Sequence, residues 1–331
     1  MKVVRLHARS DLRLHEEPDP IPGPGENIVR VKAVGICGSD LHWFAEGGIG
    51  DAQLDRPLVL GHEFAGITES GQRVAVDPAI PCGKCKFCKH GHPNLCPEIR
   101  FAGHENVDGA LREYMAWDEK CLFPLPDSIT DEEGAMLEPL GVAIHSIDLA
   151  HLKTGMTVGV FGCGPIGLLI IQLAKHSGAA KIIATDKLPH RVEAANAFGV
   201  NHALLVEDRL DSGEIQAATG GRGVDVAFEV AGDQGAVDDA FSAAIPGGKV
   251  VLAGIPDDDR TSFTASVARR KGLTVKLVRR MKHTYPRAIA LVSQGLVDVH
   301  SLVTHRFPLT QAAEAFAMAE RRDGLKIMIK P

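Results

Sequence analysis

The sequence has 331 residues, of which 45% are hydrophobic and 24% are charged, and its formal net charge is −6. At about 150 residues per domain this length predicts about two domains, and the ordinary apolar content excludes a disordered chain. The acidic balance argues against a general binder of nucleic acid or of anionic membranes.

The first ~80 residues are expected to form short strands. Residues 28–34 and 73–76 alternate between side chains of opposite polarity, which is the period of a strand with one buried face. A cluster of prolines and glycines at 20–25 marks a turn between such segments. The chain is therefore predicted to begin with a β-rich domain.

A different pattern begins after about Glu138. Short, continuous apolar segments typical of buried strands alternate with segments of helical spacing. Such alternation predicts a parallel, doubly wound sheet. The predicted strands include 158–161, 181–185, 224–228 and 249–253, and the predicted helices include 165–176 and 189–198.

A glycine-rich turn joins the first of these strands to its helix. Gly162 permits the tight turn, Gly164 lets the backbone approach a pyrophosphate, and Gly167 allows close helix–sheet packing. The helix N-terminus then faces the anion. The residues of this predicted dinucleotide site are Gly162, Gly164, Pro165, Ile166 and Gly167.

Asp186 ends the second predicted strand, 19 residues after Gly167. Its carboxylate is placed to accept hydrogen bonds from an adenosine ribose and to repel a 2′-phosphate, which favours NAD over NADP. Lys187 and Arg191 are nearby cations that would soften this preference, and Arg191 is predicted to border the cofactor. The alternative interpretation is a glycine-rich turn followed by a solvated aspartate.

Four of the seven cysteines form a C-x2-C-x2-C-x7-C pattern of Cys82, Cys85, Cys88 and Cys96. Four thiolates on one short segment predict a closed tetrahedral zinc site, which orders a loop and binds no substrate. An odd, clustered set of cysteines without a secretion signal argues against disulfides. An iron–sulfur cluster and a nucleic-acid-binding zinc ribbon are the alternatives.

Two other segments combine glycines with metal-binding side chains. One contains Cys37, and the other contains His62 and Glu63. A thiolate, an imidazole and a carboxylate would leave a fourth position on zinc for water or substrate, as in catalytic sites. Isolated cysteines and histidines are also common core residues, so the residues alone leave that alternative open.

Taken together, these motifs resemble the zinc-dependent medium-chain dehydrogenase/reductase family, in particular its sorbitol (polyol) dehydrogenase branch. The matching segments are GICGSDLH, LGHEFAG, the four-cysteine segment, LEPLGVAIH, VFGCGPIGLL, LVTHRFPL and GLKIMIKP. The resemblance implies an α/β fold with a GroES-like β-rich catalytic domain over residues 1–138. It further implies a Rossmann NAD-binding domain over 139–275, and a return to the catalytic domain over 276–331.

The resemblance also assigns the catalytic zinc. Matched by position, Cys37, His62 and Glu63 bind the metal, and Glu138 contacts its water or the metal itself. A buried glutamate paired with a cation is the alternative for Glu138. The enzyme would hold two zinc ions per chain and NAD.

A proton relay is implied as well. Zinc activates the substrate hydroxyl, hydride passes to NAD, and Ser39 and His42 carry the proton to solvent. A water route through Glu138 or Glu63 is the competing relay. The simpler alternatives are a turn hydroxyl for Ser39 and a partly buried histidine for His42.

The remaining predicted site residues are fewer and less constrained. An extra residue near 278–286 leaves open which of two arginines matches the family position. The predicted substrate contacts are Trp43, Phe101, His104 and Arg280, and the additional predicted cofactor contacts are Gly254 and Arg279.

The resemblance favours a secondary alcohol of a sorbitol- or xylitol-type polyol as substrate, oxidised to a ketose. L-Threonine 3-dehydrogenase and L-idonate 5-dehydrogenase are the close alternatives. A catalytically silent NAD-binding structural protein is the alternative of another class.

The expected assembly is a homotetramer or homodimer that binds neither nucleic acid nor membrane. The start of the chain has no apolar core of signal-peptide type, and the most apolar stretch is broken by glycines and a proline. A cytoplasmic protein is therefore expected.

Overall fold

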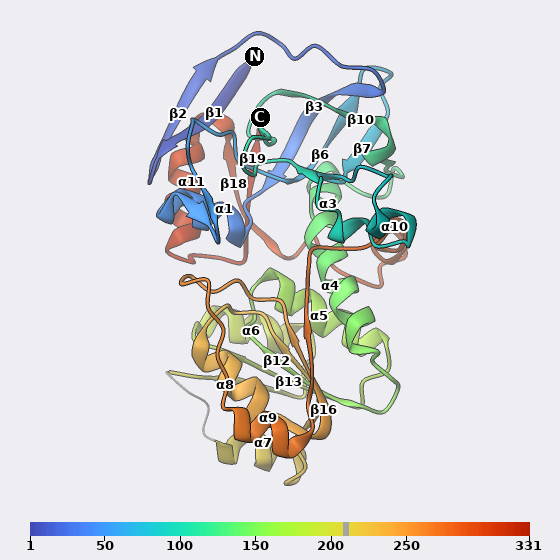
Figure 1. Cartoon of the computed structure of the whole chain (residues 1–331), viewed down its shortest axis with the longest axis vertical. Helices are drawn as coiled ribbons and strands as arrows, with labels where there is room; N and C mark the ends of the chain where they lie inside the picture. Colours follow the sequence, from blue (N-terminus) through green and yellow to red (C-terminus); the bar gives the residue numbers. More distant parts are fainter. Residues whose placement is uncertain (208–211) are drawn as a thin grey trace. The chain divides into compact units, whose positions relative to one another are not determined.

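The computed structural model describes residues 1–207 and 212–331, which divide into two compact units (Figure 1). Unit 1 comprises Met1–Gly141 and Lys282–Pro331, and unit 2 comprises Val142–Met281. The divisions therefore follow Gly141 and Met281, whereas the sequence prediction placed them after residues 138 and 275. Both chain ends belong to unit 1.

Unit 1 is rich in short strands and contains a few helices. Its strands are β1 (Lys2–Ala8), β2 (Asp11–Glu16), β3 (Glu26–Gly35), β4 (Gly48–Ile49), β5 (Ala52–Gln53), β6 (Glu63–Thr68), β7 (Arg73–Val76), β8 (Ala79–Ile80), β9 (Arg100–Phe101), β10 (Tyr114–Asp118), β11 (Leu122–Pro124), β18 (Val303–Pro308) and β19 (Lys326–Lys330). Its helices are α1 (Gly38–Glu46), α2 (Lys86–Lys89), α3 (Asp131–Ala135), α10 (Tyr285–Ser293) and α11 (Ala312–Glu320), with 3-10 turns η1 (Pro93–Leu95), η2 (Glu119–Cys121) and η3 (Leu309–Gln311). Helix α4 (Leu137–Ala150) begins in unit 1 and continues in unit 2.

A seven-stranded sheet forms the centre of unit 1 (Figure 1). Its order is β11-β7-β6-β3-β19-β18, with β10 also paired to β3. Strand β3 is antiparallel to both β6 and β19, so the C-terminal segment lies beside strands from the start of the chain. Buried aromatic side chains, among them Trp43, Phe64 and Trp117, fill the core against this sheet.

Helix α1 corrects the prediction that the first ~80 residues contain only strands and turns. It begins after Cys37, where the Asp40 carboxylate accepts the backbone N–H of Cys37 at 3.0 Å. It ends at Gly47, whose φ of 74° is a left-handed conformation that glycine adopts without strain. The capping residues at both ends therefore stabilise this helix. The alternation of apolar and polar residues in the neighbouring segments had indicated strands only.

Unit 2 is an α/β unit (Figure 1). Its six strands are all paired in parallel in the order β14-β13-β12-β15-β16-β17. The strands are β12 (Thr157–Phe161), β13 (Lys181–Asp186), β14 (His202–Leu205), β15 (Val224–Glu229), β16 (Ala244–Leu252) and β17 (Thr274–Leu277). The helices are α5 (Pro165–His176), α6 (Pro189–Ala197), α7 (Ser212–Thr219), α8 (Gln234–Ala243) and α9 (Ala265–Lys271).

The helices of unit 2 divide between the two faces of this sheet. Helix α5 contacts α6, whereas α8 contacts both α7 and α9. The chain runs from β12 outward to β14, then returns to β15 and runs outward to β17, so right-handed crossovers put these two groups on opposite faces. The predicted α/β fold class, with a GroES-like unit and a doubly wound parallel sheet, is confirmed.

Across 1–207 and 212–331, no helix has the length and apolarity needed to cross a bilayer.

Candidate active site

Asp40 ties together the two segments that carry Cys37 and His62. Its Oδ2 accepts the N–H of Cys37 at the start of α1, and its Oδ1 accepts the N–H of Gly61 at 3.1 Å. Asp40 is only 1% exposed. Burial alone would raise its pKa, but His62 and the two backbone N–H groups outweigh burial and lower the pKa.

His62 lies between Asp40 and Ser39. Its Nδ1 is 3.3 Å from Asp40 Oδ1, and its Nε2 is 3.3 Å from Ser39 Oγ. Burial lowers the pKa of this imidazole, but the Asp40 carboxylate and Cys37 outweigh burial, so the pKa stands well above its usual value. A carboxylate on one ring nitrogen fixes the ring and leaves the other nitrogen for a metal, as in many zinc sites.

Glu63 is held by a buried lysine from the far end of the chain. Lys326 Nζ donates to both Glu63 carboxylate oxygens, at 2.8 and 2.6 Å, and to the carbonyl of Ile36 at 3.0 Å. Strand β3 separates β19 from β6, and Gly35 of β3 pairs with Glu63. A Cβ at Gly35 would collide with the Glu63 carboxylate, so the glycine lets the ion pair form across β3.

We expect Lys326→Met to lower the free energy of unfolding of the zinc-free protein by about 3–5 kcal/mol, because it leaves Glu63 buried without its counter-ion. The double variant Glu63→Gln/Lys326→Met removes both charges and should recover most of that loss. Urea unfolding of the three proteins tests this. A loss below about 1 kcal/mol for Lys326→Met would show that the pair contributes little to stability.

Glu138 stands in the first turn of α4 and is 5% exposed. Burial raises the pKa of its carboxyl to about 8, with His62 opposing and Glu63 and Asp77 adding to the shift. Its titration therefore depends on both His62 and Glu63. A buried acid of this kind is a common feature of sites that bind a cation or move a proton.

The donor set of Cys37, His62 and Glu63 fits zinc. Thiolate, imidazole and carboxylate are its usual ligands. The Asp40 carboxylate stands 3.3 Å from Nδ1 of His62, so Nε2 is the ring nitrogen left for a metal. The ligand atoms of these three described residues do not all lie within 4.8 Å of one another. Both oxygens of Glu63 accept hydrogen bonds from Lys326.

Three of the predicted substrate contacts do lie together beside His62. The ring of Phe101 is 5.1 Å from that of His62 and 6.4 Å from that of His104, centroid to centroid. Trp43, buried on α1, packs edge-on against His104 at 5.5 Å. His42, also on α1, has its Nδ1 3.1 Å from Glu46 Oε1.

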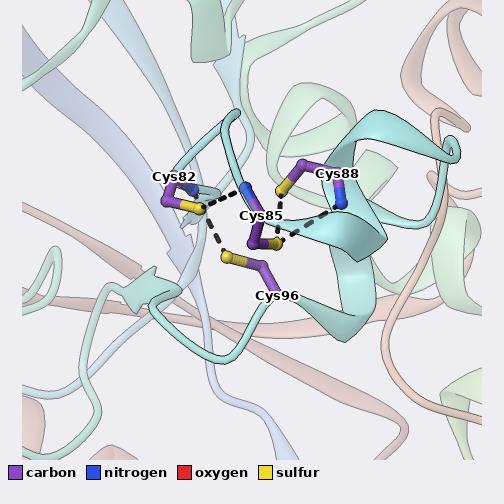
Figure 2. A group of neighbouring side chains, drawn as sticks. All are labelled: Cys82, Cys85, Cys88 and Cys96. Carbon is purple, nitrogen blue, oxygen red and sulfur yellow. Dashed lines mark hydrogen bonds between the residues drawn. The ribbon is translucent and has the colours of Figure 1, made fainter.

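The four-cysteine segment forms a compact cluster, which Figure 2 shows. The sulfur atoms of Cys82, Cys85, Cys88 and Cys96 all lie within 4.8 Å of one another, and those of Cys85 and Cys88 are 3.5 Å apart. Backbone N–H donors from Lys84 and Cys85 lower the pKa of Cys82 to about 7, which favours its thiolate. Sulfurs at these separations match a tetrahedral ion with Zn–S bonds of about 2.3 Å.

In unit 2 the glycine-rich turn has the predicted strand–turn–helix form. Gly162 follows β12 with a φ of 109°, and Gly164 is the N-cap of α5. A Cβ on Gly167 would collide with the Gly162 carbonyl, so only glycine permits this helix to start so close to the strand. Pro165 and Ile166 open the helix.

Asp186 and Arg191 border this turn. Asp186 Oδ2 accepts the N–H of Cys163 at 2.7 Å and Oδ1 accepts that of Leu188 at 2.9 Å, so the carboxylate is fixed beside the turn. The guanidinium of Arg191 lies 3.6 Å from the position of a Cβ on Gly164. Lys187 forms an ion pair with Asp233 instead, with its Nζ 3.1 Å from Asp233 Oδ2.

The other predicted contacts of unit 2 occupy two loops. Gly254 follows β16, and Arg279 and Arg280 follow β17. Arg279 is exposed, whereas Arg280 is half-buried and has a φ of 54°. A positive φ is uncommon for arginine and fixes the direction of this chain segment.

Sequence reasoning missed Asp40 and Lys326. Asp40 follows Cys37 by three residues, the spacing at which an acidic side chain reaches back to the first residue of a helix, so a capping signal was available. Lys326 is 263 residues from Glu63, and no local pattern connects the two.

Comparison with known proteins gives the family of the chain. A family model described as an alcohol dehydrogenase GroES-like domain matches residues 23–127, and one described as a zinc-binding dehydrogenase matches 165–294. The chain is 36% identical over 343 residues to the sorbitol dehydrogenase of Bacillus subtilis, covering 100% of this chain and 97% of that protein.

Solved structures agree as well. An Escherichia coli oxidoreductase of unknown specificity superposes with a TM-score of 0.93 at 30% identity, covering 99% of this chain and 98% of that one. L-Idonate 5-dehydrogenase of Escherichia coli gives 0.92 at 26% identity, covering 100% and 98%. The chain belongs to the zinc-dependent medium-chain dehydrogenases, in their polyol dehydrogenase branch, and is an NAD-dependent oxidoreductase of that family.

Proposed function

We propose that this enzyme oxidises a secondary hydroxyl of a sorbitol- or xylitol-type polyol to the ketose, with NAD as hydride acceptor. The observation that carries the proposal is the full-length likeness to the sorbitol dehydrogenase of Bacillus subtilis. The buried carboxylates Glu63 and Glu138 support it, because an acidic, polar pocket suits a substrate with several hydroxyls better than an apolar alcohol.

In this proposal Cys37, His62 and Glu63 hold the catalytic zinc, with Glu138 beside it, and the four-cysteine cluster holds the structural zinc. When bound, zinc supplies a Lewis acid for the substrate hydroxyl and NAD supplies the hydride acceptor. Asp40 fixes the ring of His62 and the start of α1, so that thiolate and imidazole are held ready. Lys326 orients the Glu63 carboxylate through hydrogen bonds to both of its oxygens.

The proton of the substrate hydroxyl leaves through Ser39. Its Oγ lies 3.3 Å from Nε2 of His62, the ring nitrogen proposed to bind zinc. His42 stands one turn further along α1 and bonds Glu46, which is 41% exposed at its side chain, so this route ends at solvent. A water route through Glu138 is the competing path.

Trp43, Phe101 and His104 are proposed to line the substrate pocket, and they form one aromatic cluster with His62 in unit 1. Arg280 stays a predicted substrate contact. Gly254 and Arg279 are proposed to contact the cofactor, together with the glycine turn and Arg191.

We expect Asp186→Ser to shift cofactor preference toward NADP, raising the NADP-to-NAD ratio of kcat/KM at least about tenfold, because it removes a carboxylate that repels the 2′-phosphate. Steady-state rates with both cofactors measure this. Glu193→Ser, an exposed change on α6, is the control. An unchanged ratio would remove Asp186 from cofactor selection.

L-Idonate 5-dehydrogenase activity is the second candidate, favoured by the structural likeness to that Escherichia coli enzyme. The zinc ligands and the glycine turn would serve both reactions, so only the pocket distinguishes them.

NADH formation by the zinc-loaded protein on sorbitol, xylitol, L-idonate, L-threonine and 2-butanol tests the proposal, with NAD and NADP compared for each. Turnover highest with sorbitol or xylitol and NAD is the expected result. Turnover confined to L-idonate or L-threonine would keep the zinc and hydride chemistry and overturn the substrate assignment.

We also propose a homotetramer or homodimer. Strand β17 is one of the two outer strands of the described parallel sheet, and its Leu277 is 76% exposed, which supports a partner at this edge. Light scattering of the purified protein measures the assembly. A cytoplasmic location is proposed because all seven cysteines are free.

A further inference from the structure

Glu229, the last residue of β15, is a buried acid that the proposed mechanism does not use. It is 2% exposed, and its Oε1 accepts the backbone N–H groups of Ala231 at 2.8 Å and Gly232 at 2.7 Å. Burial raises its pKa, although these N–H groups and that of Gly254 oppose the shift. An acid kept in the interior at this cost calls for an explanation.

Its position in the sheet is that of a ligand crevice. Strand β12 leads outward to β13 and β14, and β15 leads outward the other way to β16 and β17, so the order reverses between β12 and β15. Phe161, at the end of β12, pairs with Glu229. Dinucleotides bind outside the carboxyl ends of the strands at such a reversal.

Two loops meet at Glu229. Its backbone carbonyl accepts the N–H of Ala253 at 2.9 Å and that of Gly254 at 3.2 Å, while its carboxylate holds residues 231 and 232. A Cβ on Gly254 would lie 2.6 Å from Glu229 Oε2. One residue therefore ties the loop after β15 to the loop after β16.

The first of these loops packs on the dinucleotide turn. A Cβ on Gly162 would lie 2.9 Å from the backbone nitrogen of Ala231, and one on Gly167 would lie 3.2 Å from the side chain of Val230. A shift of the loop would therefore displace the turn, because the two segments are in close contact.

We propose that Glu229 is a positioning residue that fixes the backbone surface under the nicotinamide half of NAD. Asp186 lies on the β13 side of the reversal and suits the adenosine ribose, so the other half of the dinucleotide extends over the ends of β15 and β16. This inference rests on the proposed use of NAD.

The side chain of Glu229 acts as an acceptor toward both loops. Its Oε1 accepts the N–H groups of Ala231 and Gly232, and the carboxylate also accepts from the N–H of Gly254. A carboxylate offers only acceptors. In Glu229→Gln one oxygen becomes an NH2 group, which cannot accept a hydrogen bond. The side chain then loses its contact either with the N–H groups of Ala231 and Gly232 or with that of Gly254, while its size and the bonds of the residue 229 carbonyl are kept.

The test is isothermal titration of wild type and Glu229→Gln with NAD and with AMP, which lacks the nicotinamide half. Glu193→Gln, the same change at an exposed site of unit 2, is the control. We expect NAD to bind about tenfold more weakly to Glu229→Gln, the cost of one charge-assisted hydrogen bond, and AMP to bind unchanged. Hydrogen exchange should speed up at residues 230–232 and 253–255.

Unchanged NAD affinity, or equal weakening of NAD and AMP, would overturn the inference. If Glu229→Gln does not fold, Glu229→Asp, which keeps the charge and shortens the reach, takes its place under the same criteria. Failure of wild type to bind NAD at all would instead contradict the proposed function.

Discussion

Replacing His62 by alanine is expected to remove catalysis while leaving cofactor binding intact. Turnover should fall by about a thousandfold or more, because a zinc Lewis acid contributes several kcal/mol to the reaction. Zinc content should fall by about one ion per chain. NAD affinity should not change, since the glycine turn and Asp186 belong to unit 2.

Steady-state rates, metal analysis and NAD titration of the same preparations measure these three effects. His202→Ala, an exposed histidine on β14, is the control and should behave as wild type. Cys37→Ser repeats the test on the other segment, in case loss of His62 leaves Asp40 uncompensated. A His62 variant that keeps more than about a tenth of wild-type turnover would place the metal elsewhere.

The second large effect is expected in the four-cysteine cluster. Cys85→Ser removes one of four sulfurs that lie within 4.8 Å of one another, and the segment around Cys82–Cys96 should lose its zinc and its order. We expect the unfolding temperature to fall by about 10 °C, because metal binding in such sites is folding free energy. Turnover per correctly folded chain should fall far less than in the His62 variant.

Thermal unfolding and metal analysis measure this effect. Lys84→Ala, in the same loop and with a side chain that is 75% exposed, is the control. Wild-type zinc content in Cys85→Ser would contradict a four-sulfur zinc site. Iron in the purified wild-type protein would favour the cluster alternative.

Much of unit 2 was predictable because its signals are local. Pro165 opens α5 and His176 ends it as predicted, and β12, β13 and β15 fall within a residue or two of the predicted segments. Gly167 is required by its close approach to the carbonyl of Gly162 in the same turn. Such features depend on the sequence within a few residues.

The part that was not predicted depends on pairing between distant segments. The Lys326–Glu63 pair exists because β19 lies beside β3 and β3 beside β6, and no sequence period reports that order. From the local sequence, Glu229 is only the end of a strand. The position of its carboxylate in the sheet follows from the pairing of β12 with β15, which the sequence does not report. Asp40 was accessible from its capping position, but its contact with His62 was not.

The glutamate–lysine pair also bears on the zinc site. Lys326 donates to both oxygens of Glu63, so the neighbouring strands orient this carboxylate. Cys37 and His62, by contrast, are joined through Asp40. The proposed ligand set therefore combines two positions held by one aspartate and a third held from the other end of the chain.

The most direct test of the central claim, zinc-dependent polyol oxidation at Cys37 and His62, is the rate of NADH formation from sorbitol and xylitol as zinc is returned to metal-free protein. Turnover is predicted to appear when zinc fills the site that His62→Ala removes. Zinc bound by the four-cysteine cluster alone should restore stability without turnover. Full turnover in protein whose only zinc is in that cluster, or no turnover with either polyol when both sites are filled, would contradict it.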